Sequence, residues 1–225
     1  CQNIILPLDQ NGLASIATTD IDFGSSDNCG SIISSLDSTT FSCNDLGDNL
    51  VVLTITDQGG LTSTCNAMVT VVDTLAPQIF TQDIIVYLDA NGQVSITAQD
   101  IDAGSTDNCG IVSYSIDTTS FDCSNTGPNQ VTLTLTDASA NTSASTTIVT
   151  VIDATAPTAI CQNITLELDA SGNAFLAPSD IDSGSSDNCT VSQIALSQTN
   201  FDCSTIGQNQ VVFTITDASG NSSSC

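Results

Sequence analysis

Apolar and polar residues alternate along several short stretches of the chain, the pattern that predicts β-strands with one buried face. In residues 130–137, QVTLTLTD, Val and Leu alternate with Thr, and residues 82–89, QDIIVYLD, lead into an Asp-Ala-Asn-Gly turn. A second short run, QVSIT, follows that turn, as is typical of a β-hairpin. Short strands separated by turns every roughly 8 to 12 residues predict an all-β fold of immunoglobulin-like β-sandwiches.

The whole pattern recurs with a period of 80 residues. The tripeptide Asp-Asn-Cys occurs at positions 27–29, 107–109 and 187–189. A fixed offset of this length predicts a tandem array of similar units. We expect three repeats, at residues 1–76, 77–156 and 157–225.

The segments that join the repeats, VVDTLAP and VIDATAP, are short and contain Pro77 and Pro157. Such linkers are expected to be stiff, so the repeats should form an elongated rod. The third repeat stops at Cys225, before the residues that match the last strand of the first repeat. We expect that strand to come from further sequence or from another chain.

The charge of the chain has one sign. It contains 25 acidic residues and no Lys, Arg or His, which gives a formal net charge of -25. Binding to nucleic acid or to an anionic membrane is excluded, because both depend on basic side chains. Paired carboxylates can hydrolyse glycosides, but the acidic loop recurs three times and the chain has no nucleophile elbow, so we predict no enzymatic activity.

The cysteines follow the repeat, with one exception. The second repeat has Thr81 and Ser145 where its neighbours have cysteines, and this joint loss indicates bonded partners in the other repeats. The second repeat keeps only Cys109 and Cys123, which pair most simply with each other. The 80-residue offset then predicts five disulfides: Cys1–Cys65, Cys29–Cys43, Cys109–Cys123, Cys161–Cys225 and Cys189–Cys203.

The alternative role for these cysteines is metal ligation. That role would need four converging ligands, with C-x-x-C pairs or histidines, and the chain has neither. Five disulfides favour an oxidising compartment, so we expect the protein to be secreted or anchored at a cell surface.

Four short motifs carry a resemblance to a known family. They are Cys-Gln-Asn-Ile at Cys1 and Cys161, the Asp-Asn-Cys loop, Thr-x-Thr-Asp-x-x-Gly-Asn at 214–221, and Val-Thr-Val-x-Asp-x-x-Ala-Pro at 69–77. Together each repeat resembles a hyalin repeat (HYR) domain, and the array resembles those of giant secreted adhesins of Bacteroidota. The resemblance implies an immunoglobulin-like fold, a disulfide between the first and last strands, and display at a cell surface.

Acidic side chains gather where successive repeats are expected to meet. In an immunoglobulin-type sandwich, the loop between the second and third strands lies at the same end as the last hairpin turn and the incoming linker. We expect residues 100–102 to be extended, so that Asp100 and Asp102 face one site while Ile101 faces the core. Several carboxylates without a basic partner need a cation, and hard oxygen ligands favour Ca²⁺.

The predicted calcium ligands fall into three groups. At the first junction they are Asp73, Asp100, Asp102, Asp107, Asn108 and Asp137, and at the second Asp153, Asp180, Asp182, Asp187, Asn188 and Asp217. The matching positions of the first repeat are Asp20, Asp22, Asp27 and Asp57. The alternative is that these residues only terminate turns and solvate loops, as we expect for Asp9, Asp89 and Asp169.

These features predict a structural stalk or fibre segment of an extracellular adhesin, whose partners are further repeats of the same or neighbouring chains, surface glycans or other cells. Two alternatives are a glycan-binding array and a self-assembling filament. Glycan binding would favour exposed aromatic platforms, whereas the chain has no Trp and only Tyr87 and Tyr114. The resemblance to Bacteroidota proteins also suggests O-glycans at Ser38, Thr74 and Thr118.

Overall fold

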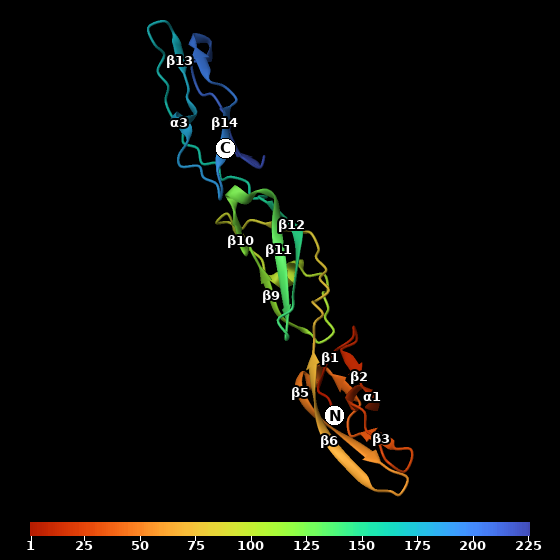
Figure 1. Ribbon diagram of the computed structural model, residues 1–225. Coiled ribbons are helices and arrows are strands. Elements are labelled where there is room, and N and C mark those ends of the chain that lie inside the picture. Colours follow the sequence, from red (N-terminus) through yellow and green to blue (C-terminus); the bar gives the residue numbers. More distant parts are fainter. The chain divides into compact units, whose positions relative to one another are not determined.

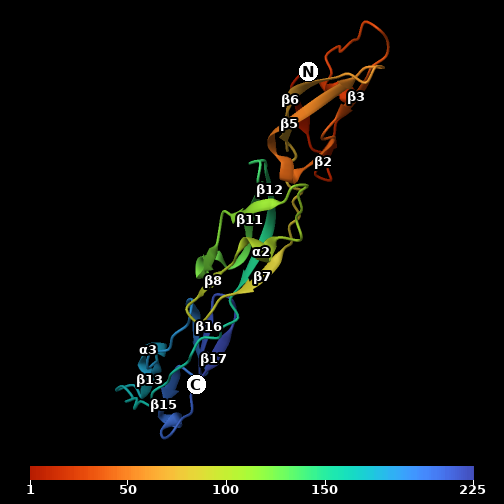
Figure 2. The ribbon, with the colours of Figure 1, turned by 90° about the horizontal axis from the view of Figure 1, so that it is seen from below.

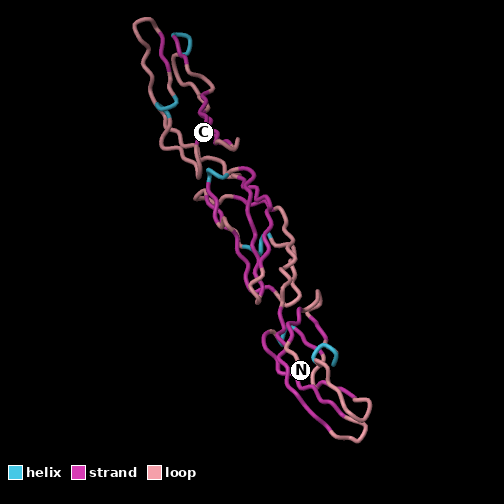
Figure 3. Tube along the Cα trace, viewed as in Figure 1, coloured by secondary structure: helices cyan, strands magenta, loops and turns pink.

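The computed structural model describes all residues from 1 to 225, and the chain is nearly all β (Figures 1 and 3). Internal contacts divide it into two compact units that do not follow the sequence repeats. Unit 1 comprises Cys1–Thr81, Asp102–Ser115 and Leu133–Ser145, and unit 2 comprises Gln82–Ile101, Ile116–Thr132 and Thr146–Cys225. Each unit therefore contains one of the two linkers together with the acidic loop and hairpin turn that follow it in sequence.

The first repeat contains two sheets. Its elements are β1 (Ile4–Pro7), β2 (Leu13–Ser15), α1 (Thr18–Ile21), β3 (Ile33–Leu36), β4 (Thr40–Ser42), η1 (Cys43–Asp45), β5 (Gly47–Thr56) and β6 (Thr62–Val72). The larger sheet has the order β1-β6-β5-β3, with β1 parallel to β6, and β2 pairs with β4. Alternate residues of β5 and β6, such as Val51, Leu53, Val69 and Val71, are buried in one core with Phe41.

The second repeat has the same order of elements. They are β7 (Ile84–Tyr87), β8 (Gln93–Ser95), α2 (Ala98–Ile101), β9 (Ile111–Ile116), β10 (Ser120–Asp122), η2 (Cys123–Asn125), β11 (Gly127–Asp137) and β12 (Thr142–Ile152). The strand order β7-β12-β11-β9 repeats that of the first sheet. Val131, Leu133 and Leu135 are fully buried, and the Thr residues between them are only half-buried, as the alternating pattern predicts.

The third repeat has fewer strands. Its elements are β13 (Asn173–Phe175), α3 (Pro178–Ile181), β14 (Val191–Leu196), β15 (Asn200–Asp202), η3 (Cys203–Thr205), β16 (Phe213–Asp217) and β17 (Ser222–Ser224). The sheets are β14-β16-β17 and β13-β15, and the second pair is seen in Figure 2. Leu168 is half-buried, whereas the matching Leu8 and Leu88 are buried.

The third repeat has no strand at the positions of β1. In the first repeat, β1 pairs with the last four residues of β6, from Val69 to Val72. Residues 164–167, at the matching positions of the third repeat, form no strand.

The segment expected to be extended around Asp100 is helical instead. Residues 98–101 form the single turn α2, and α1 and α3 occupy the matching positions. The Asp100 carboxylate accepts hydrogen bonds from the Thr97 backbone N–H at 2.7 Å and from the Thr97 hydroxyl at 2.9 Å, which caps this turn. Ile101 faces the core as expected, with none of its surface exposed.

Candidate metal centres

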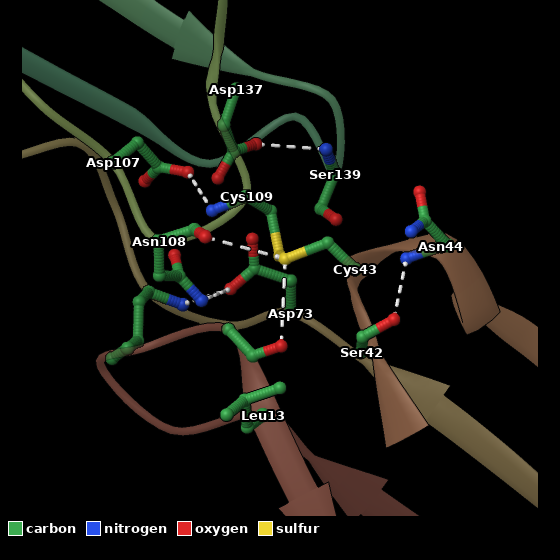
Figure 4. The surroundings of a disulfide bond; sticks show 12 residues. Leu13, Ser42, Cys43, Asn44, Asp73, Asp107, Asn108, Cys109, Asp137 and Ser139 are labelled. Carbon is green, nitrogen blue, oxygen red and sulfur yellow. Dashed lines mark hydrogen bonds between the residues drawn. A yellow bond between two sulfur atoms is a disulfide. The ribbon is translucent and has the colours of Figure 1, made fainter.

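Three carboxylates from distant parts of the sequence converge in unit 1. Asp73 directly follows β6, Asp107 lies in the Asp-Asn-Cys loop, and Asp137 is the last residue of β11. One oxygen from each lies within 4.8 Å of one from each of the others. Asp73 and Asp137 are buried, with 6% and 2% of their surface exposed. Figure 4 shows the three side chains around the loop that holds Asp107.

Each carboxylate uses one oxygen to fix its own backbone. Asp107 Oδ2 accepts a hydrogen bond from the Cys109 N–H at 2.9 Å, and Asp73 Oδ1 accepts one from the Leu75 N–H at 3.1 Å. Asp137 Oδ1 accepts hydrogen bonds from the N–H groups of Ser139 and Asn141 at 2.9 and 2.8 Å. These contacts are Asx-type turns, and they orient the remaining oxygens without satisfying them.

The remaining oxygens include three that are buried and have no hydrogen-bond donor. They are Asp73 Oδ2, Asp107 Oδ1 and Asn108 Oδ1. The Asn108 amide nitrogen donates to Asp73 Oδ1 at 3.1 Å and to the Asp9 carbonyl at 3.2 Å, which sets the orientation of its oxygen. Buried polar atoms are nearly always paired, so three orphaned oxygens in one cluster indicate a missing electropositive partner.

The same cluster occurs in unit 2. Asp153, Asp187 and Asp217 also have carboxylate oxygens within 4.8 Å of one another. Its buried oxygens without a donor are the matching set, Asp153 Oδ2, Asp187 Oδ1 and Asn188 Oδ1. The two clusters thus present the same three unsatisfied atoms, although they are built from different residues.

One supporting residue was missed by the sequence reasoning. Asn141 donates through its side chain to Asp137 Oδ2 at 2.8 Å and to the Asp73 carbonyl at 3.1 Å, and so ties the hairpin turn to the linker. Asn221 makes the equivalent bonds to Asp217 and Asp153. The signal was present in the repeat, since both asparagines lie four positions after the cluster aspartate; the first repeat has Leu61 there instead.

Half of the predicted ligands lie outside these clusters. Asp100 caps α2, and Asp102 Oδ1 accepts hydrogen bonds from the N–H and hydroxyl groups of Ser105 at 3.1 and 2.5 Å. The backbone hydrogen bond from Thr97 holds the pKa of Asp100 below its ordinary value. Asp180 and Asp182 have the same local roles, as do Asp20 and Asp22. The prediction failed here because it assumed an extended segment rather than a capped helical turn.

The remaining two predicted ligands, Asp27 and Asp57, lie in the first repeat at the positions of Asp107 and Asp137. Asp27 Oδ2 accepts a hydrogen bond from the Cys29 N–H at 2.8 Å, and Asp57 Oδ1 accepts one from the Leu61 N–H at 2.8 Å. Neither belongs to a cluster of three acidic residues.

The disulfides differ from the prediction at three of the five bonds. Cys1–Cys65 and Cys161–Cys225 are present, with Cα atoms 6.0 Å apart in both. In the second repeat a hydrogen bond of 3.3 Å between the hydroxyls of Thr81 and Ser145 takes the place of this disulfide. These bonds join the segment at the start of the repeat to the strand that ends it.

The predicted pairs Cys29–Cys43, Cys109–Cys123 and Cys189–Cys203 are wrong. Cys43 bonds to Cys109, and Cys123 bonds to Cys189, each pair joining one repeat to the next. The 80-residue offset is compatible with both pairing schemes, because it relates equivalent cysteines and does not say which repeat supplies the partner. The second scheme leaves Cys29 and Cys203 without a disulfide partner within these residues, and both are free and exposed.

The Cys43–Cys109 bond lies directly beside the acidic cluster (Figure 4). Cys109 is two residues from Asp107, and the Asn108 carbonyl oxygen lies 3.3 Å from Cys43 Sγ. The turn at Gly12 packs closely against the same loop and disulfide. An added Cβ at Gly12 would lie 2.6 Å from both the Asn108 carbonyl oxygen and Cys43 Sγ. The disulfide and this close approach fix the loop that carries Asp107 and Asn108.

Comparisons with known proteins show no family. No family model and no curated protein matches the sequence. Similar solved structures include human CDH23 EC21-23, with a TM-score of 0.39 and 14% identity over 78% of this chain and 72% of that one. Protocadherin Gamma B7 extracellular cadherin domains 1-4 give 0.31 and 15%, covering 100% and 74% of the two chains.

A further similar structure is human mucin-like protocadherin EC1-2, with a TM-score of 0.32 and 15% identity over 68% of this chain and 97% of that one.

No helix of the chain is both long enough and apolar enough to cross a membrane. The four disulfides are typical of proteins that fold in an oxidising, extracellular environment.

Proposed function

We propose that the protein is a structural segment of an extracellular adhesive stalk, in which each acidic cluster binds one Ca²⁺ ion and thereby fixes a linker, a loop and a hairpin turn. The observation that carries this proposal is the set of buried oxygens without donors, three in each cluster. The repeats are of the hyalin type, and the chain has no catalytic role.

The electrostatics of the clusters favour a bound cation. Two carboxylate charges about 5 Å apart repel by about 1 kcal/mol at the dielectric constant of water and by about 3 kcal/mol at an effective value of 20. Three such pairs occur in each cluster, and the chain contains no Lys, Arg or His to offset them. A cation is therefore the simplest source of the missing stabilisation.

The ligand atoms favour calcium over other ions. Asp73, Asp107, Asn108 and Asp137 offer only oxygen, from carboxylates and one amide, which are the hard ligands that Ca²⁺ and Mg²⁺ prefer. Calcium accepts six to eight oxygens with flexible geometry, whereas Mg²⁺ requires a near-ideal octahedron. A site assembled from a linker, a loop and a turn suits the more tolerant ion.

The disulfide prepares the site before the ion binds. Because Cys109 is bonded to Cys43, the loop with Asp107 and Asn108 is held near Asp73 even without metal. Preorganisation of this kind lowers the entropy lost on binding. Calcium and the disulfide thus act on the same loop, one by charge and one by covalent restraint.

Thermal melting tests the proposal. Protein stripped of metal should melt at a lower temperature in excess EDTA than in millimolar CaCl₂, because an ion that binds only the folded state stabilises it. The Asp73→Asn, Asp153→Asn double variant should lose most of this difference. Asp100→Asn removes one charge from the helical turn α2, outside the cluster, and is the matched control that should keep the difference. Equal melting temperatures with calcium and with EDTA would contradict the proposal.

A further inference from the structure

The two free cysteines are located at positions whose equivalents are bonded elsewhere in the same chain. Cys29 matches Cys109 and Cys189, and both of these are bonded to the preceding repeat. Cys203 matches Cys43 and Cys123, and both of these are bonded to the following repeat. Every other cysteine of the chain is in a disulfide. Cys29 is thus a loop cysteine without its partner, and Cys203 is a receiving cysteine without its loop.

The third repeat retains the shape that receives an Asp-Asn-Cys loop in the other two. At Gly12 and Gly92 a Cβ would meet both a cysteine Sγ and the carbonyl oxygen of the incoming Asn, at 2.5 to 2.7 Å. At Gly172 the only heavy atom that a Cβ would meet is Cys203 Sγ, at 2.8 Å. The Asp169 to Gly172 turn also keeps its hydrogen bond of 2.9 Å from the Gly172 N–H to the Asp169 carbonyl.

The first repeat retains the matching loop. The Cys29 N–H donates to Asp27 Oδ2 at 2.8 Å, as the Cys109 and Cys189 N–H groups donate to Asp107 and Asp187 at 2.9 Å. In the two bonded cases the adjacent Asn also donates to the carbonyl of the receiving turn, Asn108 to Asp9 and Asn188 to Asp89. The counterparts of this pair, which do not bond to each other within the chain, are Asn28 and the Asp169 carbonyl.

We propose that Cys203 and the Asp169–Gly172 turn receive the Asp27–Cys29 loop of another repeat of this kind, which a second copy of this chain supplies for the isolated protein, and that a Cys203–Cys29 disulfide closes the contact. The interface is head to tail, so each copy uses one surface of its first repeat and a different surface of its third repeat, and the association continues into chains.

The bond forms by thiol–disulfide exchange with a small disulfide oxidant such as oxidised glutathione. The Cys203 thiolate attacks this disulfide, forms a mixed disulfide and releases one glutathione thiolate. The Cys29 thiolate then attacks the Cys203 sulfur and releases the second. The two protein thiols are oxidised to one disulfide, the oxidant is reduced to two thiols, and the two protons pass to the released glutathione.

The test uses the whole chain with its four disulfides intact, in 0.15 M salt with a glutathione redox buffer. Non-reducing electrophoresis should show a ladder of dimers, trimers and larger species. Mass spectrometry of a digest should identify a peptide that joins Cys29 to Cys203. The experiment requires no calcium, so its failure and the failure of the metal sites are separate results.

Two single variants test whether the bond joins Cys29 of one copy to Cys203 of another. Cys29→Ser alone and Cys203→Ser alone should each remain monomeric, and an equimolar mixture of the two should give a dimer and nothing larger. Both cysteines are exposed and unbonded, so neither change should lower the melting temperature. Symmetric dimers from either variant alone, at rates comparable to the mixture, would show random thiol collision and overturn the proposal, as would the absence of any ladder.

A third variant tests the fit of the loop while keeping both thiols. Asn28→Ala removes the side chain that is expected to donate to the Asp169 carbonyl, and we expect dimer formation to slow by about tenfold, the factor that corresponds to one hydrogen bond of roughly 1.4 kcal/mol. The matched control is Asn44→Ala, next to a cysteine that is already bonded, which should leave the rate unchanged. Equal rates for Asn28→Ala and the unmodified chain would contradict recognition of the loop.

Discussion

Cys43 and Cys109 are 66 residues apart in the sequence, and their Cα atoms lie 5.3 Å apart across a disulfide that joins the first repeat to the second. The linker through Asp73 connects the same two repeats along the backbone, so the junction has two covalent connections. The acidic cluster lies between them, with Asp73 on the linker and Asp107 two residues from the bonded cysteine.

Removal of this disulfide should destabilise unit 1. In the chain-entropy description, closing a loop of this length stabilises the folded state by about 4 kcal/mol. We expect the Cys43→Ser, Cys109→Ser double variant to melt at a lower temperature and to require more calcium to recover stability. Cys29→Ser is the matched control, and a double variant that melts like this control would show that the bond contributes nothing.

Restoring the disulfide that the second repeat lacks should have the opposite effect. The hydroxyls of Thr81 and Ser145 are 3.3 Å apart, at the positions of Cys1 and Cys65. Thr81→Cys with Ser145→Cys should therefore form a bond and raise the free energy of unfolding by up to about 4 kcal/mol. Chemical denaturation with and without reductant measures this gain, and a midpoint that reductant does not change would contradict it.

The carboxylate of Asp137 should matter for calcium through its charge. Asn at this position keeps an oxygen that can accept from the N–H groups of Ser139 and Asn141, and removes one negative charge beside Asp73 and Asp107. We expect Asp137→Asn to weaken calcium binding at the first cluster by at least about tenfold and to leave the second unchanged, as titration calorimetry would show. The control is Asp102→Asn. Asp102 accepts a hydrogen bond from the Ser105 N–H and lies outside the cluster, so this variant should bind calcium like the unmodified chain.

Acid should destabilise the fold through carboxylates outside the clusters. Hydrogen bonds from the Ile148 N–H and the Thr147 hydroxyl hold the pKa of Asp83 below its ordinary value, and the Thr132 N–H has the same effect on the pKa of Asp117. A folded-state pKa below the unfolded value of about 3.9 gives stability that is present above that value and is lost as the pH falls through the folded pKa.

Asp83→Asn tests this dependence. In EDTA it should lower the melting temperature clearly at pH 7, and this loss should shrink as the pH falls from 7 through the folded-state pKa of Asp83, because protonation then removes the same charge from the parent residue. Asp48→Asn, at an exposed position that bonds only the Thr70 hydroxyl, is the control and should show a smaller loss at pH 7. A constant difference for Asp83→Asn across this pH range would contradict the assignment.

The sequence predicted the all-β fold and the repeat because both depend on local patterns. Val131, Leu133 and Leu135 alternate with Thr, and this alternation alone identifies a strand with one buried face. Only part of the predicted ligand set lies in the clusters. Asp73, Asp107 and Asp137 follow from the expected end of the sandwich at which they lie, whereas Asp100 and Asp102 were assigned to it from an assumed extended backbone.

The disulfides between repeats could not be predicted from the offset. Cys109 can pair with Cys123 in its own repeat or with Cys43 in the preceding one, and both choices satisfy an 80-residue period. The choice depends on where the Asp-Asn-Cys loop lies in space, which is against the Gly12 turn rather than beside Cys123. Glycine at position 12 makes the close approach possible, because a Cβ there would lie too close to the loop, and the positive φ of 71° would strain any other residue.

The most direct test of the central claim is a count of bound calcium. Equilibrium dialysis of metal-free protein, followed by elemental analysis, should find two calcium ions per chain, one for each cluster. The Asp73→Asn variant should bind one, and the Asp73→Asn, Asp153→Asn double variant none. Binding of two ions by the double variant, or of none by the unmodified chain at millimolar calcium, would contradict the account.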